Sequence, residues 1–277
     1  MLRACAVESA SSNASANTGN PPRAVVRHLF SSEGQDALRR LAGTRVLFAF
    51  DFDGTLAPIV GQPNAARVST GLRRRLASLA RHAPVAVISG RSFADLRARL
   101  PAEVMHCIGN HGNEGPDLDH DATALRGTCA AWLTQLQGPL ADPATDRGIM
   151  LEDKGMTLSL HYRMARDRAA TEAWLERLVG ALVPTPRVIG GKCVLNLLPP
   201  GARTKFEAIV EISTHTEVDQ VFFVGDDDTD EIVFAQAPHN WITVRVDFNS
   251  ASRAAFFIQA QSEVAALLDR LLTLSGA

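Results

Sequence analysis

Two carboxylates separated by one residue follow an apolar run near the start of the chain. The segment FAFDFDGTLAP places Asp51 and Asp53 directly before Gly54 and Thr55. Two like charges at this spacing repel each other, so a protein keeps them together when a cation lies between them or when one holds a proton. Gly54 and Thr55 begin a tight turn whose amides could face an anion. The segment therefore points to metal binding, to acid–base chemistry, or to both.

A second acidic cluster follows another apolar run late in the chain. The segment VFFVGDDDTDE carries Asp226, Asp227, Asp228, Asp230 and Glu231. A solvated polar loop is the alternative for either cluster taken alone. However, two carboxylate clusters at the same edge of one parallel sheet would make a strongly negative pocket at the edge where open α/β sheets bind ligands. A hard cation with oxygen ligands, such as Mg²⁺, would stabilise that pocket.

Two further segments carry groups that bind anions. Ser89, Gly90 and Arg91 end a predicted strand and begin a helix, where a hydroxyl and backbone amides are available. Lys205 begins another predicted helix, whose dipole favours an anion at that end. Among the 28 basic residues, lysine occurs only at positions 154, 192 and 205. We therefore interpret Lys205 as a required ammonium rather than an ordinary surface lysine.

The pattern of apolar residues predicts the elements that position these groups. Runs that are apolar at every position are typical of parallel strands buried on both faces, and they lie at 46–50, 84–89, 104–109, 221–225 and 241–246. Helical spacing and capping signals predict helices at 35–42, 69–82, 92–100, 166–182, 205–213 and 262–274. The alternation predicts an α/β fold with a doubly wound, mostly parallel, Rossmann-like core sheet.

The middle of the chain has a different pattern. Residues 156–163, MTLSLHYR, alternate strictly between apolar residues and the set Thr157, Ser159, His161 and Arg163. Such alternation indicates a sheet with one face in water. It predicts a separate α+β unit.

Three regions follow from these patterns. We expect a core domain of residues 35–114 and 198–277, with an α+β cap domain of residues 115–197 inserted into it. Residues 1–34 are rich in Ser, Asn, Ala and Pro, which predicts a disordered N-terminal tail.

The composition limits the class of partner. A net charge of −2 gives no electrostatic reason to expect nucleic acid or an anionic membrane. No apolar run approaches the ~18 residues of a membrane span. The four cysteines are scattered without a C-x-x-C pair, which favours a reducing cytoplasm over a disulfide framework or a zinc site. We expect a cytoplasmic monomer that acts on a small molecule.

Four segments in this order resemble the motifs of haloacid dehalogenase-type phosphatases: DFDGT, SGR, an isolated Lys205 and GDDDTDE. Within that superfamily, GNHGNE (109–114), LEDKGMTLSLHYR (151–163) and GKCVLNLLPPG (191–201) resemble the trehalose-6-phosphate phosphatases. The resemblance extends from about residue 45 to residue 273. It implies the same core-and-cap fold and a magnesium-dependent phosphatase that acts on a sugar phosphate.

The resemblance also implies catalytic roles. Asp51 would attack phosphorus and form an aspartyl-phosphate, and Asp53 would protonate the leaving sugar oxygen and then deprotonate the attacking water. Magnesium would be bound by Asp226, Asp51 and the backbone carbonyl of Asp53, supported by Asp227 and Asp230. The residues implied to surround the phosphate are Thr55, Ser89, Gly90 and Lys205.

The implied substrate is trehalose 6-phosphate, and seven residues are expected to surround the sugar: Arg91, His111, Glu152, Lys154, His161, Arg163 and Asn196. Two residues depart from the family. Asn196 stands where the family usually has glutamate, so it loses a charge and gains a donor. Phe206 follows Lys205 where the family usually has glycine.

Other functions stay open on the sequence. Asn196 leaves room for a related phosphatase of sucrose phosphate or of a glycosyl-phosphoglycerate. A catalytically silent partner of a trehalose-making synthase is a second alternative, although such a protein would be expected to have lost a motif residue. A phospho-acceptor receiver domain is a third, and it is disfavoured because a receiver has no need of Asp53 as an acid.

Overall fold

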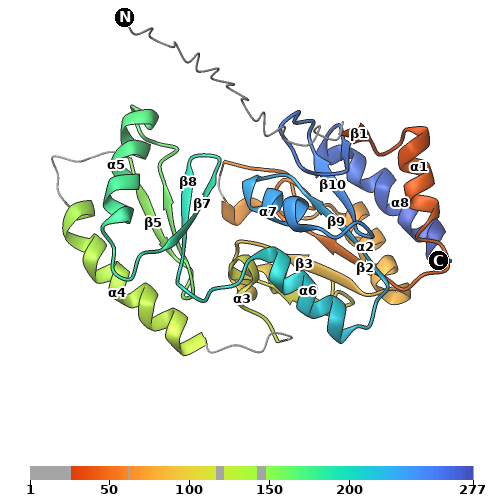
Figure 1. Ribbon diagram of the computed structural model, residues 1–277, viewed down its shortest axis with the longest axis horizontal. Coiled ribbons are helices and arrows are strands. Elements are labelled where there is room, and N and C mark those ends of the chain that lie inside the picture. The colour runs from red at the N-terminus through yellow and green to blue at the C-terminus, as the bar shows by residue number, and fades with distance from the viewer. Residues whose placement is uncertain (1–25, 62, 117–121, 142–147, 277) are drawn as a thin grey trace, which may run out of the picture.

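Two sheets organise the part of the chain that the computed structural model describes, which is residues 26–61, 63–116, 122–141 and 148–276 (Figure 1). The larger sheet has seven strands in the order β1-β11-β10-β9-β2-β3-β4, and all neighbouring pairs are parallel. Its strands are β1 (Arg27–His28), β2 (Val46–Phe50), β3 (Val85–Ile88), β4 (His106–Ile108), β9 (Gln220–Gly225), β10 (Ile242–Val246) and β11 (Phe256–Ile258). The prediction of an α/β fold with a mostly parallel core sheet is confirmed.

Helices cover both faces of this sheet. They are α1 (Ser32–Arg39), α2 (Thr70–His82), α3 (Phe93–Arg99), α6 (Lys205–His215), α7 (Asp228–Gln236) and α8 (Val264–Leu274). Alternate residues of β2 face opposite sides, as the strand period requires. Phe48 and Phe50 pack in one cluster with α1, α2, α3 and α8, whereas Leu47 and Ala49 pack in another with α6 and α7. The sheet is therefore doubly wound.

The smaller sheet belongs to the cap. It is antiparallel in the order β5-β6-β8-β7, formed by β5 (Met150–Asp153), β6 (Leu158–His161), β7 (Arg187–Gly191) and β8 (Val194–Leu198). Two helices, α4 (Ala122–Ala141) and α5 (Arg168–Gly180), pack on the face turned away from the core domain (Figure 1). The described cap elements run from Ala122 to Leu198.

The other face of the cap sheet is only partly in water, since Glu152 and Arg163 are exposed but two of the expected polar residues are buried. Thr157 and Ser159 are both 0% exposed. The Thr157 hydroxyl donates to Asn110 Oδ1 of the core domain at 2.8 Å, and Ser159 donates to Asn196 Oδ1 at 2.7 Å. Alternation identifies which face of a strand is polar, but a polar face can also be buried when polar groups of another domain satisfy it.

The expected start of the core domain at residue 35 was also wrong. Strand β1 pairs with Phe256 and Phe257 of β11, and α1 begins at Ser32 with Ser31 as its N-cap, rather than spanning 35–42. A two-residue strand leaves no periodic signal in the sequence, so its place depends on its neighbour. Residues 1–25 of the expected tail lie outside the described residues.

None of the described helices combines the length and the apolar character that crossing a membrane requires.

Leu76 on α2 tests how much the core depends on this packing. Leu76 is 0% exposed, while Arg74 on the same helix is exposed. We expect Leu76→Ala to lower the free energy of unfolding by about 2–5 kcal/mol because it leaves a cavity, and Arg74→Ala to change it by less than about 0.5 kcal/mol. Urea denaturation of both variants measures the difference, and equal effects would contradict this description of the core.

Candidate active site

The central strands β2 and β9 end at the same edge of the large sheet. Asp51 follows β2 directly, and its backbone amide donates to the Val224 carbonyl of β9 at 2.8 Å. Asp226 follows β9, and Asp230 lies in the first turn of α7. The two acidic clusters of the sequence therefore come together, as expected for the carboxyl ends of parallel strands.

Three buried carboxylates form one group at this edge. Asp51, Asp226 and Asp230 each offer an oxygen, and these oxygens all lie within 4.8 Å of one another. The three residues are 4%, 3% and 0% exposed. Burying several like charges costs free energy unless opposite charge compensates them.

Lys205 supplies part of that compensation. Its ammonium donates to Asp51 Oδ1 at 2.6 Å and to Asp230 Oδ1 at 2.8 Å. Lys205 is the first residue of α6, and Thr204 and Glu207 fix that end of the helix with a capping box. Burial alone would lower the pKa of Lys205, but the charges of Asp230 and Asp51 outweigh it and raise the pKa well above its usual value. Lys205 therefore remains a cation inside the cluster.

One lysine does not neutralise the cluster. Burial, and then the charges of Asp230 and Asp227, raise the pKa of Asp226 to about 8. Asp226 Oδ1 is buried and has no hydrogen-bond partner among the described residues. A second cation with oxygen ligands would satisfy this atom and lower the repulsion, so the donor set fits Mg²⁺.

Two glycines let the backbone approach these carboxylates. A Cβ at Gly54 would lie 2.2 Å from Asp226 Oδ2, and Gly54 has a left-handed φ of +85°. A Cβ at Gly225 would lie 2.2 Å from the Asp230 carboxyl carbon. Both distances are far below van der Waals contact, so any side chain at either position would displace a carboxylate.

Other predicted residues line the same edge. Thr55 is 0% exposed, and its hydroxyl has no partner among the described residues. Ser89 is 1% exposed and follows β3. Gly90 has His111 directly above it, since a Cβ there would lie 2.5 Å from His111 Cε1. The hydroxyls and the glycine that the sequence assigned to phosphate thus follow the neighbouring strands β2 and β3.

His111 is a buried neutral histidine. It is 5% exposed, and neither ring nitrogen has a hydrogen-bond partner within the described part of the chain. Burial, and then the charges of Lys154 and Lys205, lower its pKa to about 3. An imidazole held in this state offers one donor and one acceptor to a ligand at neutral pH.

Asp53 and Arg91 form an ion pair that the sequence did not predict. The Asp53 carboxylate lies outside the group of three and accepts from Arg91 Nε at 2.7 Å and from Arg91 Nη2 at 2.6 Å. The sequence assigned Arg91 to the sugar, and in the structure its guanidinium pairs with Asp53. The motif could not reveal this pairing, because the two residues are 38 positions apart.

Asp227 supports the site through the helix that carries Asp230. Its side chain accepts from the backbone amides of Thr229 and Asp230 and forms a capping box at the start of α7. The Asp230 carboxylate in turn accepts from the amides of Asp226 and Asp227 at 2.9 and 3.1 Å. Asp227 thus lies next to the carboxylate group without belonging to it.

The cap residues lie in two sets. Glu152 and His161 pair across β5 and β6 at 2.8 Å, and Lys154 Nζ lies 3.7 Å from Glu152. Asn196 of β8 is 5% exposed and accepts from Ser159. Arg163 is exposed and donates to the carbonyl of Lys192 at 3.3 Å.

Lys192 is a residue that the sequence reasoning missed. It lies in the turn between β7 and β8, and its ammonium is 3.7 Å from Asp226 Oδ2. The cap therefore reaches the carboxylate group directly. The rarity of lysine was the available signal, but nothing in the sequence showed that this turn approaches the core domain.

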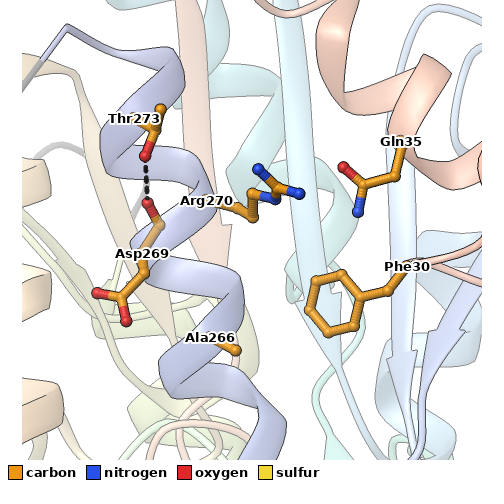
Figure 2. A pocket seen from close by; sticks show the side chains of 6 residues that line it. All are labelled: Phe30, Gln35, Ala266, Asp269, Arg270 and Thr273. Carbon is orange, nitrogen blue, oxygen red and sulfur yellow. Dashed lines mark hydrogen bonds between the residues drawn. The ribbon is translucent and has the colours of Figure 1, made fainter.

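An open hollow of about 580 Å³ lies elsewhere, between α1 and α8. Figure 2 shows its lining residues, which include Phe30, Gln35 and Arg270. None of the residues that line it was predicted for the site, so we place the chemistry at the sheet edge.

The titration of His111 can be tested by its effect on stability. The unfolded chain binds a proton at this ring below pH 6.5, but the folded chain does so only near pH 3. The neutral His111 ring therefore favours the folded chain fully above pH 6.5, and this part of the free energy of unfolding is lost as the pH falls toward 3. His111 has a left-handed backbone with a φ of 57°, which asparagine tolerates. Between pH 6.5 and pH 4.5, we expect the free energy of unfolding to fall by up to about 2 kcal/mol less in His111→Asn than in the wild-type protein. Unchanged slopes in urea denaturation would show that the ring titrates normally.

Comparisons with known proteins agree with this geometry. Residues 49–263 match the trehalose-phosphatase family. The chain is 32% identical over 268 residues to the trehalose-phosphate phosphatase of Mycobacterium marinum, covering 90% of this chain and 68% of that protein. It is 34% identical over 266 residues to the trehalose-phosphate phosphatase of Mycobacterium leprae, covering 87% of this chain and 62% of that protein. The chain thus spans about two thirds of these relatives.

Solved structures share the fold. The C-terminal domain of the trehalose-6-phosphate phosphatase of C. albicans superposes with a TM-score of 0.67 at 22% identity, covering 91% of this chain and 99% of that chain. A trehalose-6-phosphate phosphatase related protein gives the same TM-score at 21% identity, with 83% and 98% covered. Since the family match covers most of the chain, this protein belongs to the trehalose-phosphatase family of phosphatase enzymes.

Proposed function

We propose that this protein is a magnesium-dependent phosphatase that hydrolyses trehalose 6-phosphate to trehalose and phosphate. The observation that carries the proposal is the buried group of Asp51, Asp226 and Asp230 with the Lys205 ammonium between two of them. This group combines a nucleophile, a cation and the ligands for another cation at one point. The names of the mycobacterial relatives support the choice of substrate.

The reaction proceeds in two steps on this chain. In the first, a carboxylate oxygen of Asp51 attacks phosphorus, the bond between phosphorus and the sugar oxygen breaks, and Asp53 gives that oxygen its proton. In the second, Asp53 takes a proton from water as the water attacks phosphorus. The bond to Asp51 then breaks and phosphate leaves. Asp53 returns to its protonated state, so atoms and charges balance over the cycle.

Charge on the phosphoryl oxygens has to be countered in both steps. Lys205 lies 2.6 Å from the nucleophile and begins a helix, so its charge and the α6 dipole act together. Thr55 offers a buried hydroxyl with no partner among the described residues, and Ser89 offers another at the neighbouring strand. A bound Mg²⁺, held by Asp51 and Asp226, would supply Lewis-acid stabilisation of the same oxygens.

The sugar would lie between the two domains. On the core side, the ring nitrogens of His111 have no hydrogen-bond partner among the described residues, while Glu152, Lys154 and His161 form a paired polar set on the cap side. Alternating donors and acceptors of this kind suit sugar hydroxyls. A cap that covers the phosphate also keeps the aspartyl-phosphate away from uncontrolled water.

Asn196 keeps a second substrate class open. Its side chain is occupied within the cap, accepting from Ser159 and donating to the Ile189 carbonyl at 3.3 Å. It therefore presents a neutral amide where the family usually has a carboxylate. A related sugar phosphate, such as sucrose phosphate or a glycosyl-phosphoglycerate, is the alternative substrate.

The proposal extends to the setting of the enzyme. Cys129 is buried and forms no disulfide with another described cysteine, which suits a reducing cytoplasm. We propose a cytoplasmic monomer. A catalytically silent partner of a synthase fits less well, because Asp51, Asp53, Lys205 and Asp226 are all present.

Phosphate release from the purified protein tests the proposal. We expect Mg²⁺-dependent turnover that EDTA abolishes and added Mg²⁺ restores, with trehalose 6-phosphate preferred over glucose 6-phosphate, sucrose 6-phosphate and glycosyl-phosphoglycerates. Asp51→Asn removes the nucleophile and should lower the rate by at least about 10³-fold.

A matched control lies in the second acidic run. Asp226→Asn should abolish the response to Mg²⁺, while Asp228→Asn, which removes an exposed carboxylate two residues away, should leave it intact. A preference for another sugar phosphate would keep the mechanism and change the substrate. The absence of turnover with every compound would refute the enzymatic proposal.

A further inference from the structure

Arg91 holds the Asp53 carboxylate at two points. Its Nε and Nη2 donate to different carboxylate oxygens at 2.7 and 2.6 Å. A two-point contact of this kind fixes both the place and the plane of a carboxylate, which a single ammonium cannot do. The Arg91 side chain is only 10% exposed, whereas Asp53 is 41% exposed. The buried partner therefore positions the accessible one.

The guanidinium is itself held from two further sides. Arg91 Nη1 donates to Asp95 Oδ2 at 2.8 Å, and Arg99 fixes Asp95 from the next turn of α3, with Nε at 3.0 Å. The ring of Phe52 lies 5.2 Å from the Arg91 guanidinium carbon, within the range of a cation–π contact. Arg91 is thus connected through α3 to the core domain and leaves Asp53 as its outer partner.

The charges of this array also act on a lysine of the cap. Lys154 of the cap lies close enough for the charges of Asp53 and Arg91 to act on its ammonium. Lys154 is in turn 3.7 Å from Glu152, which pairs with His161. Charges of alternating sign therefore run from α3 through Asp53 to the cap sheet, where the sugar is proposed to lie.

We propose that Arg91 is a positioning residue for the acid–base function of Asp53, an inference that rests on the proposed function. Arg91 occupies one lone pair on each carboxylate oxygen, and each oxygen keeps a second one for the leaving group or for water. After Asp53 has given its proton to the sugar oxygen, the guanidinium stabilises the carboxylate that remains. The contact is therefore stronger after proton transfer than before it, which is the condition for lowering the barrier.

Two substrates with different leaving groups distinguish a positioning role of Arg91 from a merely structural one. An alkyl phosphate needs a proton on its leaving oxygen, whereas 4-nitrophenyl phosphate releases a stable anion without one. We expect Arg91→Met to lower kcat on trehalose 6-phosphate roughly 10–100-fold, with KM changed less than about threefold because the proposed role of Arg91 is exerted through Asp53. The first burst of 4-nitrophenolate, which reports attack by Asp51, should change less than about threefold.

Two further variants separate positioning from folding. Arg91→Lys keeps the charge but not the two-point contact, so it should recover only part of the loss on trehalose 6-phosphate. Arg75→Met removes a remote Arg–Asp pair, with Asp269 at 2.7 Å, and should leave both substrates unchanged. Urea denaturation confirms that each variant is folded under assay conditions.

The outcomes are distinguishable from those of the proposed function. The activity of the wild-type protein tests the proposed function. If the wild-type protein prefers another alkyl phosphate to trehalose 6-phosphate, that compound takes its place in the comparison of variants. Equal losses on alkyl and aryl phosphates, a rise in KM alone, or no loss in Arg91→Met would each overturn the positioning role. A wild-type protein that turns over neither substrate would overturn both proposals.

Discussion

The burial of three carboxylates around one ammonium is the constraint on which the rest of the structure depends. Asp51, Asp226 and Asp230 are nearly inaccessible to water, and Lys205 contacts two of them. Such a group is stable only if its positive charge is held in place and if no water-filled gap weakens the contacts. The glycines at 54 and 225, which admit no side chain beside these carboxylates, satisfy the second condition.

Helix ends satisfy the first condition. Lys205 begins α6 behind a Thr204 cap, and Asp227 caps α7 so that Asp230 faces inward. Lys205 and Asp230 therefore both occupy the first turn of a helix, where capping fixes the backbone and the dipole contributes charge. The same principle applies at α3, where Arg91 precedes the N-cap and reaches back to Asp53. The site is rigid because its residues belong to element ends rather than to long loops.

The cap contributes polar and charged groups to the edge of the core sheet, while its apolar residues form a separate cluster. Its apolar residues pack against α4 and α5, and part of its polar face contacts the core domain, where Thr157 bonds to Asn110. Lys192 approaches Asp226, and Lys154 acts on Asp53, so both cap lysines approach acidic groups of the core. All three lysines of a chain that otherwise uses arginine thus lie at the active edge. A compact ammonium fits a crowded carboxylate group better than a planar guanidinium does.

The sequence predicted the strands of the core sheet except β1 and β11, its helices except α7, and the two acidic clusters at its edge. Fully apolar runs such as 46–50 are typical of strands inside a parallel sheet, and the carboxyl ends of such strands lie at one edge, so the proximity of Asp51 and Asp226 was predictable. Only the tertiary structure decided which groups face each other across long separations. The pairing of Asp53 with Arg91, the approach of Lys192 to Asp226 and the burial of Thr157 join residues from different elements or domains. Local periodicity records the exposure and direction of a side chain within its element, whereas a partner dozens of residues away is set by how the elements pack.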